Sequence, residues 1–248
     1  MEIIVPNEGE DLISLATRCN ALYICPKTAD RRRKGPLVPY AGKDTGGANF
    51  VGDIYFNFRR IEPNPKVVMA FAETVRRQIT EEELLYEFDT IVGIPNGGRT
   101  FGQALAYAAN KRFVYPEKVP KETEFGKKQE YDWDFSQFDF EEGERVAIAE
   151  DVFNNFQNTD HTLNTIAMTG AIPVLLVGAL NRSMIYRSSY TSKIEMFSGK
   201  DLRIVASINK SYPEYRQDDP DVAADVAAGN VEWQVKKNWA RLRAAMDN

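Results

Sequence analysis

The sequence predicts an α/β fold built on a mostly parallel sheet. Apolar runs of strand length alternate along the middle of the chain with segments of helical spacing. The four predicted strands cover residues 88–94, 145–149, 172–180 and 202–208. Because these runs are apolar nearly throughout, we expect helices to cover both faces of the sheet.

Helical segments lie between and before these strands. We predict helices over residues 100–111 and about 160–169, each after one of the strands. A third is predicted over residues 66–79, just after the Pro63-Asn64-Pro65 stop signal. Its apolar residues recur at helical spacing: Val68, Phe71, Ala72, Val75 and Ile79.

We expect one domain over residues 1–248. Residues 1–60, rich in Gly, Pro and aromatic residues, are predicted to form a cap or hood, and 61–215 the α/β core. Residues 216–248 are predicted to be a helical extension, with Asp219 as cap and Pro220 at the first helical position. Gly229 and Asn230 offer a break into two segments. An apolar stripe predicts docking onto the domain or a partner subunit: Val231, Val235, Trp239, Leu242 and Met246.

Composition excludes several classes of protein. A formal charge of −5 argues against a dedicated nucleic-acid binder. The basic cluster at residues 31–34, RRRK, is interpreted as a solvated loop, with a phosphate-facing patch as the alternative. Two cysteines, Cys19 and Cys25, and a single histidine, His161, cannot form a closed zinc site without carboxylates.

The N-terminal residues do not resemble a secretory signal, because MEIIVPNEGEDL is acidic and no basic region precedes an apolar core. No window approaches the roughly 18 consecutive apolar residues of a membrane span. We therefore expect a cytoplasmic protein without a membrane partner.

Three loops leave the carboxyl ends of predicted strands, where ligands bind in an open parallel sheet. In the first, GIPNGGRTFG, Gly97 and Gly98 allow positive φ and close approach to an anion at the following helix. The second begins with the adjacent carboxylates Glu150 and Asp151, which repel each other unless they bind a cation, a polyol or a positive partner. The third places Arg182 where it can bind a planar anion such as a carboxylate.

These segments resemble the type I phosphoribosyltransferases, and most closely the orotate phosphoribosyltransferases. VAIAEDV (146–152) is similar to the family's strand and acidic pair, and GIPNGGRTFGQALA (93–106) to its pyrophosphate loop. LLVGALNRS (175–183) resembles the strand whose terminal arginine contacts the base. YAGKDTGGANFVGDIYFNF (40–58) resembles the amino-terminal hood more faintly. The resemblance covers about residues 35–210 and implies a phosphoribosyltransferase-type, Rossmann-like core.

The resemblance implies a transferase that joins phosphoribosyl pyrophosphate (PRPP) to an orotate-like base in pyrimidine nucleotide synthesis and releases pyrophosphate. It assigns catalysis to Glu150, Asp151, Lys118 and Lys121. It assigns the PRPP phosphates to Pro95, Asn96, Gly97, Gly98, Asn154, Asn155, Asn158 and Thr159. It assigns the base to Arg182, Tyr55 and Phe56. Magnesium (Mg²⁺) is the implied cofactor, placed indirectly by Glu150 and Asp151 through the PRPP-bound ion. A homodimer is also implied.

Negative charge beside the sugar suits this reaction, because its transition state is oxocarbenium-like, whereas the departing pyrophosphate needs cations and backbone N–H groups. No protein nucleophile is required, in agreement with a sequence that has no recognisable Ser-His-Asp or Cys-His arrangement.

The sequence departs from the family pattern in three places. After Asp151 the loop has no glycine. Its Asn residues tolerate the left-handed backbone, and its Asn and Thr side chains can donate to phosphate oxygens, so a phosphate site could survive, whereas Asp160 disfavours a phosphate dianion. In residues 115–128, Glu117 stands where the family has arginine; Lys127 or Lys128 is a possible substitute. In the hood, Lys43 is a possible stand-in for a lysine expected near Tyr40. His161 is interpreted as a helix-start residue rather than an acid or base.

Two alternatives stay open. One is a catalytically weak or inactive relative that binds a nucleotide or phosphosugar in a regulatory or structural role, which the glycine-free loop favours. The other is the same fold acting on a purine base, because hood residues decide base choice. Arg182 favours the acidic pyrimidine.

Overall fold

The computed structural model describes residues 3–121, 131–197 and 199–247. The chain divides into two compact units. The first comprises Met1–Pro6 and Asn64–Lys210, and the second Asn7–Pro63 and Ser211–Asn248.

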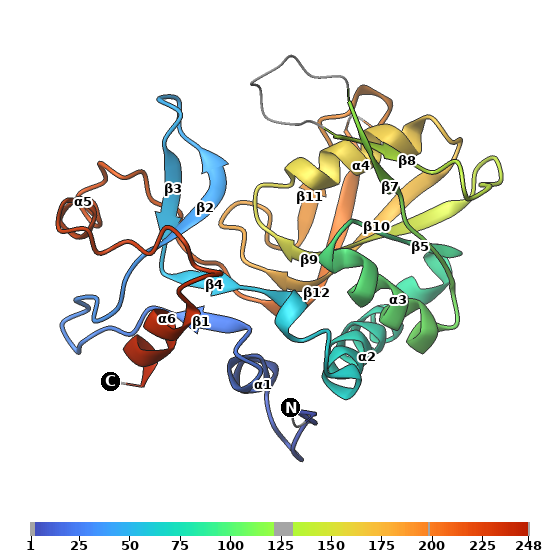
Figure 1. Cartoon of the computed structure of the whole chain (residues 1–248). Coiled ribbons are helices and arrows are strands. Elements are labelled where there is room, and N and C mark those ends of the chain that lie inside the picture. Colours follow the sequence, from blue (N-terminus) through green and yellow to red (C-terminus); the bar gives the residue numbers. More distant parts are fainter. Residues whose placement is uncertain (1–2, 122–130, 198, 248) are drawn as a thin grey trace. The chain divides into compact units, whose positions relative to one another are not determined.

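The first unit contains a six-stranded sheet in the order β11-β12-β10-β9-β5-β6 (Figure 1). Five strands run parallel and β11 is antiparallel to β12. The α/β class and all four predicted strands are therefore confirmed. The strands are β5 (Thr90–Gly93), β6 (Arg112–Val114), β9 (Arg145–Phe153), β10 (Ile172–Asn181), β11 (Ser189–Thr191) and β12 (Asp201–Asn209).

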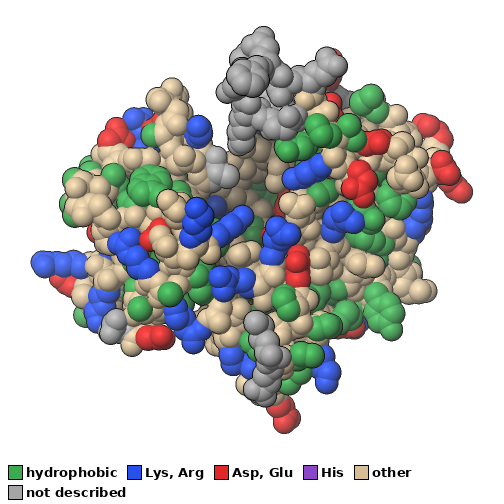
Figure 2. Space-filling view, viewed as in Figure 1, with side chains coloured by type: hydrophobic (Ala, Val, Ile, Leu, Met, Phe, Trp, Pro, Cys, Tyr) green, Lys and Arg blue, Asp and Glu red, His purple; other side chains and the backbone are tan. Residues whose placement is uncertain are grey.

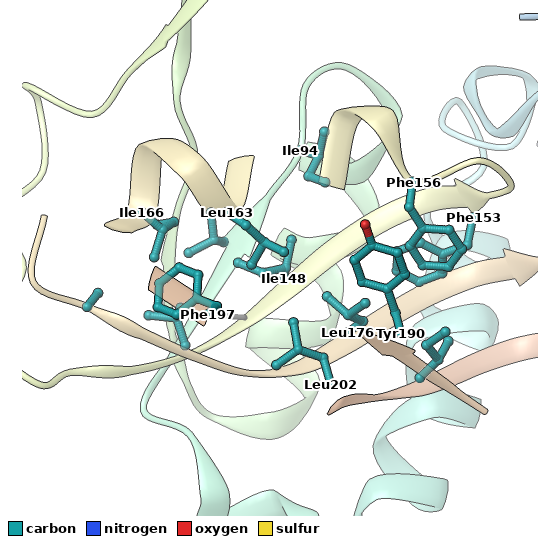
Figure 3. Close-up of a cluster of buried hydrophobic side chains, with 14 of the residues drawn as sticks. Ile94, Ile148, Phe153, Phe156, Leu163, Ile166, Leu176, Tyr190, Phe197 and Leu202 are labelled. Atoms are coloured by element: carbon teal, nitrogen blue, oxygen red, sulfur yellow. The ribbon is translucent and has the colours of Figure 1, made fainter. Parts of the chain in front are cut away.

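Helices cover both faces of this sheet, as the apolar strands predict. The helices are α2 (Pro65–Glu81), α3 (Gly97–Ala109) and α4 (Gln157–Ala167), with short 3-10 turns η2 (Leu84–Glu87) and η3 (Glu195–Phe197). On β9, Ile148 packs in one buried cluster with Leu163 of α4 (Figure 3). Ala149 points the other way, toward α3, because a Cβ on Gly102 would lie 3.0 Å from the Ala149 Cβ.

An antiparallel ribbon accompanies α4. It consists of β7 (Glu117–Pro120) and β8 (Tyr131–Asp134), and β8 contacts α4. Most ribbon side chains are exposed, but Trp133 is buried at 8% exposure. One ribbon residue is therefore packed against the core of the unit.

The second unit joins the N-terminal and C-terminal segments of the chain. It contains two antiparallel strand pairs, β1–β4 and β2–β3. An isolated bridge pairs Leu37 with Val231, and both residues lie in one buried cluster with Val51 and Val222. Its elements are α1 (Leu12–Arg18), β1 (Leu22–Ile24), β2 (Val38–Lys43), β3 (Asn49–Gly52), β4 (Ile54–Phe56), η1 (Phe58–Arg60), α5 (Ala223–Ala227) and α6 (Trp239–Met246).

The predicted C-terminal helix is shorter and more divided than expected. Only α5 and α6 are helical, because Gly229 adopts a positive φ of 71° and Val231 pairs with Leu37. The apolar stripe is nevertheless buried at Val231, Val235, Trp239 and Leu242. The stripe thus packs inside the second unit.

The solvated-loop interpretation of residues 31–34 is wrong for Arg33. Its Nε lies 2.6 Å from Asp53 Oδ1, and its Nη1 lies 3.2 Å from Asp225 Oδ2. The Arg33 side chain is only 9% exposed. This arginine therefore ties the two chain ends of the second unit together.

Charged side chains of both signs are interspersed on the face shown in Figure 2, in keeping with 31 basic and 36 acidic residues. Within the described ranges, no helix combines the length and apolar character needed to cross a bilayer.

Candidate active site

The acidic pair lies at the carboxyl edge of the sheet, but not at the end of its strand. β9 continues to Phe153, whereas the prediction ended it at Ala149. The neighbouring strand β5 pairs with β9 only as far as Ala149, and β10 pairs with it through Phe153. Glu150 and Asp151 therefore lie where β5 no longer pairs with β9, and the start of α3 lies beside β9 instead.

The glycine turn meets Asp151 directly. A Cβ on Gly97 would lie 2.2 Å from Asp151 Oδ2, and one on Gly98 would lie 2.4 Å from the Ala149 carbonyl oxygen. Neither glycine has a positive φ, so the left-handed conformation that glycine allows is not used here. Both are glycine because β9 lies so close. Gly97 and Gly98 open α3, with Pro95 buried and Asn96 exposed before them.

Glu150 is buried, at 6% exposure, and its carboxyl shares a hydrogen bond with the Asp151 side chain. Burial raises the pKa of the Glu150 carboxyl well above its usual range, and the charge of Asp151 raises it further. A hydrogen bond with the Asn158 side chain acts in the opposite direction. Among the described residues, neither acid forms an ion pair. The two carboxyls are thus suited to different roles, with the protonated form favoured at Glu150.

Replacing Glu150 with Gln should make stability less dependent on pH. A carboxyl whose folded pKa is raised stabilises the folded state below its unfolded pKa, near 4.5, and this contribution is lost as pH rises toward the folded pKa. A tenfold change in the acid dissociation constant of the Glu150 carboxyl between the unfolded and folded states corresponds to about 1.4 kcal/mol in the free energy of unfolding. Urea titrations measure the free energy of unfolding. The value for Glu150→Gln, relative to that of the parent chain, should therefore be higher at pH 8 than at pH 4.5.

The matched control is Glu81→Gln on an exposed position of α2. It should change the free energy of unfolding equally at both pH values. A Glu150→Gln effect that is also independent of pH would contradict the elevated pKa.

The loop after β9 is organised by aromatic rings rather than by glycine. Phe156 is buried at 3% exposure and adopts the left-handed conformation, with φ of 59°. Its ring stacks on Phe153 at 5.2 Å and on Tyr190 at 4.5 Å (Figure 3). The left-handed residue of this loop is thus Phe156 and not one of its Asn residues, because the ring contacts hold Phe156 in that conformation.

The predicted phosphate-binding residues surround the beginning of α4. Asn154 and Asn155 are half-buried in the loop, Asn158 is exposed and Thr159 is buried. Phe156 precedes this helix and offers no capping side chain, and the Gln157 N–H at its start donates to Asn155 Oδ1 at 3.4 Å. Its first N–H groups have no carbonyl within the helix to bind, and they are anion-binding groups in general.

Asp160 is turned toward the aromatic core. Its carboxylate accepts a hydrogen bond from the Tyr190 hydroxyl, and burial together with this contact raises the pKa of Tyr190. The tyrosine therefore remains a donor that holds the Asp160 carboxylate. Sequence reasoning did not identify Tyr190, which lies 30 residues from Asp160.

Arg182 lies beside the acidic strand, directly after β10. It is buried at 9% exposure, and its backbone N–H donates to the Phe153 carbonyl at 3.1 Å. The preceding Asn181 holds the loop: its Nδ2 donates to the Tyr186 carbonyl at 2.9 Å, and its Oδ1 accepts from the Ser183 N–H at 3.1 Å. Asn181 therefore fixes the course of this loop, and the sequence prediction missed it, although Asn side chains commonly hydrogen-bond the backbone two residues on.

The two predicted lysines lie on and beside the β7–β8 ribbon. Lys118 Nζ is 5.1 Å from the centroid of a Trp133 ring, and Lys121 Nζ is 2.8 Å from Asp132 Oδ1. Glu117, where the family has arginine, lies 4.0 Å from Arg99 of α3. The possible substitutes Lys127 and Lys128 fall outside the described residues.

The interpretation of His161 as a helix-start residue is wrong. α4 begins at Gln157, which puts His161 in the second turn, stacked on Trp133 with ring centroids 5.1 Å apart. Its Nε2 lies 3.6 Å from Asp132 Oδ1.

The predicted hood residues belong to the second unit. Tyr55 and Phe56 lie on β4 and are half-buried, with the Tyr55 ring 6.1 Å from Trp239 and the Phe56 ring 6.2 Å from Phe58. Lys43 ends β2. The first unit therefore contains the residues predicted to act in catalysis and to bind phosphate, together with Arg182. The second unit contains the two aromatic residues predicted to contact the base, Tyr55 and Phe56.

The carboxylates of the candidate site fit Mg²⁺ as an ion that a substrate carries. In the part of the chain that the structure describes, no group of three or more His, Cys, Asp or Glu side chains could hold a metal. Mg²⁺ is commonly held by one or two carboxylates together with substrate phosphates and water. Asp151, beside the glycine turn, can contribute one such carboxylate.

Comparison with known proteins gives the family likeness. No family model matches the chain. The orotate phosphoribosyltransferases of Campylobacter jejuni subsp. doylei and of Campylobacter jejuni subsp. jejuni serotype O:2 are 27% and 26% identical over 128 residues. Each match covers 52% of this chain and 58% of the relative's length, which is less than two thirds of the relative.

A solved structure supports the fold. Orotate phosphoribosyltransferase from Aeropyrum pernix matches with a TM-score of 0.50 and 14% identity, over 79% of this chain and 92% of that one. The chain has the type I phosphoribosyltransferase fold, with a mostly parallel six-stranded sheet and small N-terminal sheets like a hood.

Proposed function

We propose that this chain is a phosphoribosyltransferase that joins PRPP to an orotate-like pyrimidine base and releases pyrophosphate. One observation carries the proposal: Asp151 and the glycine turn of α3 meet at the carboxyl edge of the sheet, where a Cβ on Gly97 would lie 2.2 Å from Asp151 Oδ2. A carboxylate for the sugar and a backbone turn for the diphosphate are thus adjacent.

In this reaction a base nitrogen forms a bond to the anomeric carbon of the ribose while the bond from that carbon to pyrophosphate breaks. Positive charge grows on the ring, and the Asp151 carboxylate stabilises it. Glu150, beside Asp151 on β9, forms a hydrogen bond with a ribose hydroxyl. Asp151 could hold the magnesium ion that PRPP carries, and that ion would neutralise charge on the diphosphate.

The remaining residues receive roles by position. The diphosphate binds at Pro95, Asn96, Gly97 and Gly98, and the ribose 5′-phosphate binds at the start of α4 with Asn154, Asn155, Asn158 and Thr159. Lys118 and Lys121 neutralise the departing pyrophosphate. Arg182 binds the carboxylate of the base. The family resemblance alone assigns the ring of the base to Tyr55 and Phe56, which belong to the second unit. Because the Tyr190 hydroxyl holds Asp160, that carboxylate is compatible with a phosphate at α4.

Thermal unfolding with PRPP and Mg²⁺, orotate or orotidine monophosphate tests ligand binding. A ligand at a hundred times its dissociation constant stabilises the folded state by about 2.7 kcal/mol. A pyrophosphate-release assay with orotate, uracil and adenine then tests the reaction and the base. Release with orotate is the expected result, and release with adenine alone would replace the pyrimidine by a purine.

Replacing Arg182 with Ala should weaken use of orotate more than use of uracil, which has no carboxylate. A hydrogen bond to a charged group contributes about 1.5–3 kcal/mol, so we expect kcat/KM for orotate to fall roughly ten- to a hundredfold. Steady-state rates with both bases measure the difference.

Arg187→Ala, an exposed arginine in the same loop, is the control and should leave both bases unaffected. Equal losses for orotate and uracil in Arg182→Ala would remove Arg182 from base recognition.

A second candidate is a non-catalytic relative that binds a phosphosugar or nucleotide. The aromatic, glycine-free loop around Phe156 favours it, because a buried ring occupies the loop after the acidic strand. Stabilisation by PRPP, without release of pyrophosphate from PRPP in the presence of any of the three bases, would support this candidate over the transferase.

A further inference from the structure

Lys118 and His161 both contact the ring of one buried tryptophan. Trp133 is the direct cross-strand partner of Lys118, whose Nζ lies 5.1 Å from the ring centroid. The rings of Trp133 and His161 are stacked, with an interplanar angle of 29°. The ribbon that carries the lysine is thus joined to α4 through a pair of rings.

Asp132 makes a second connection at the same place. Its Oδ1 lies 2.8 Å from Lys121 Nζ and 3.6 Å from His161 Nε2. The hydrogen bond with Lys121 and the nearby His161 lower the pKa of the Asp132 carboxyl, which keeps it anionic. Both lysines of the proposed site are therefore linked to His161 through adjacent residues of β8.

The contacts of Trp133 involve the face of its ring rather than its N–H group. The Trp133 indole nitrogen is buried and has no hydrogen-bond partner among the described residues. Burying this donor costs stability that a phenylalanine would not lose. In return, indole is the aromatic ring that attracts a cation most strongly, and a cation, Lys118, lies over it.

We propose that Trp133 and His161 are positioning residues that hold the ribbon on α4 and fix the place of the Lys118 ammonium group. This inference rests on the proposed function, in which Lys118 neutralises the departing pyrophosphate. His161, which the Trp133 ring contacts, lies on α4 just after Asn158 and Thr159, two of the residues proposed to bind the phosphate. The lysine is thereby set relative to the helix that is proposed to bind the phosphate.

Variants that remove or keep each ring test the proposal. Trp133→Leu and His161→Ala should lower kcat about tenfold with KM for the base unchanged, because small misplacements of a catalytic group are costly. Trp133→Phe and His161→Phe keep an aromatic ring and should stay within about threefold of the parent chain. A His161→Phe loss as large as that of His161→Ala would make the imidazole itself necessary and would overturn a purely positional role.

A double-mutant cycle with Lys118→Met shows whether Trp133 acts through the lysine. If it does, Trp133→Leu should cause little further loss of kcat once Lys118 is absent. Losses that multiply in the double variant would mean independent effects and would overturn the proposal. Melting curves of each variant establish that it is folded.

Acylation of lysines, followed by peptide mass spectrometry, tests the contact without any enzymatic activity. Losing a surface cation–π contact should raise the acylation rate of Lys118 about two- to fivefold in Trp133→Leu, and less in Trp133→Phe. Lys66, exposed on α2, should be unchanged in both. Absence of turnover in the parent chain would contradict the proposed function, whereas an unchanged Lys118 rate would contradict this inference.

Discussion

Asp151→Asn should lower PRPP-dependent pyrophosphate release about a hundred- to a thousandfold while leaving the chain folded. The amide has nearly the shape of the carboxylate but no charge, so it cannot stabilise the positive charge that grows on the ribose. Losing one such preorganised electrostatic group commonly has an effect of this size. The measurement is kcat with orotate at saturating PRPP and Mg²⁺, with a melting curve to establish that the variant is folded.

Two further variants make this result specific. Asp89→Asn changes an exposed carboxylate just before β5, at the opposite end of that strand from the glycine turn, and should leave kcat unchanged. Glu150→Gln should lower kcat less than Asp151→Asn does, because an amide is a closer substitute for a carboxyl whose protonated form is favoured. Unchanged turnover in Asp151→Asn would remove this carboxylate from the reaction. A larger loss in Glu150→Gln would exchange the roles of the two acids.

Elements with long apolar runs or strong helical spacing were predictable from the sequence. β10 and β12 were predicted almost to their ends, and so was α2, whose buried residues include all five of its predicted apolar positions. The short edge strands β6 and β11 were not predicted, because three residues with few buried side chains give no periodic pattern. Their pairing with neighbours in the sheet decides their conformation.

The candidate site was predictable from the sequence only where its residues are neighbours along the chain. Glu150 and Asp151 are adjacent on one strand, and the glycine pair marks its own turn. The different environments of the two acids could not be predicted, because they depend on which side of β9 is covered. The contact of Trp133 with His161 was missed for the same reason: 28 residues separate them (161 − 133), and no short pattern connects them.

The glycine-free loop shows how tertiary contacts override local preference. A phenylalanine in the left-handed conformation is unfavourable by itself, and an Asn would be the usual choice. Here the rings of Phe153, Tyr186 and Tyr190 surround Phe156, with the Tyr186 ring edge-on at 5.0 Å. The buried Phe156 ring gives the loop one backbone conformation, which glycine would not do.

Phe156→Ala should destabilise the chain by about 3–5 kcal/mol and also abolish stabilisation by PRPP. The first effect is the usual cost of removing a buried Phe ring, and here the stacked contacts with Phe153 and Tyr190 are lost with it. The second follows because the ring fixes the backbone that leads into α4, where the 5′-phosphate is proposed to bind. Urea unfolding with and without PRPP and Mg²⁺ measures both.

Phe197→Ala separates the two effects. Phe197 is buried at 4% exposure in the same hydrophobic cluster but lies on η3, outside the loop. It should cost a similar free energy of unfolding and leave stabilisation by PRPP intact. Phe156→Gly should be less destabilised than Phe156→Ala by about 1 kcal/mol, because glycine adopts the positive φ without strain, yet it should bind PRPP no better. If Phe156→Ala and Phe197→Ala kept PRPP stabilisation equally well, the ring would be a core residue only and the phosphate would have to bind elsewhere.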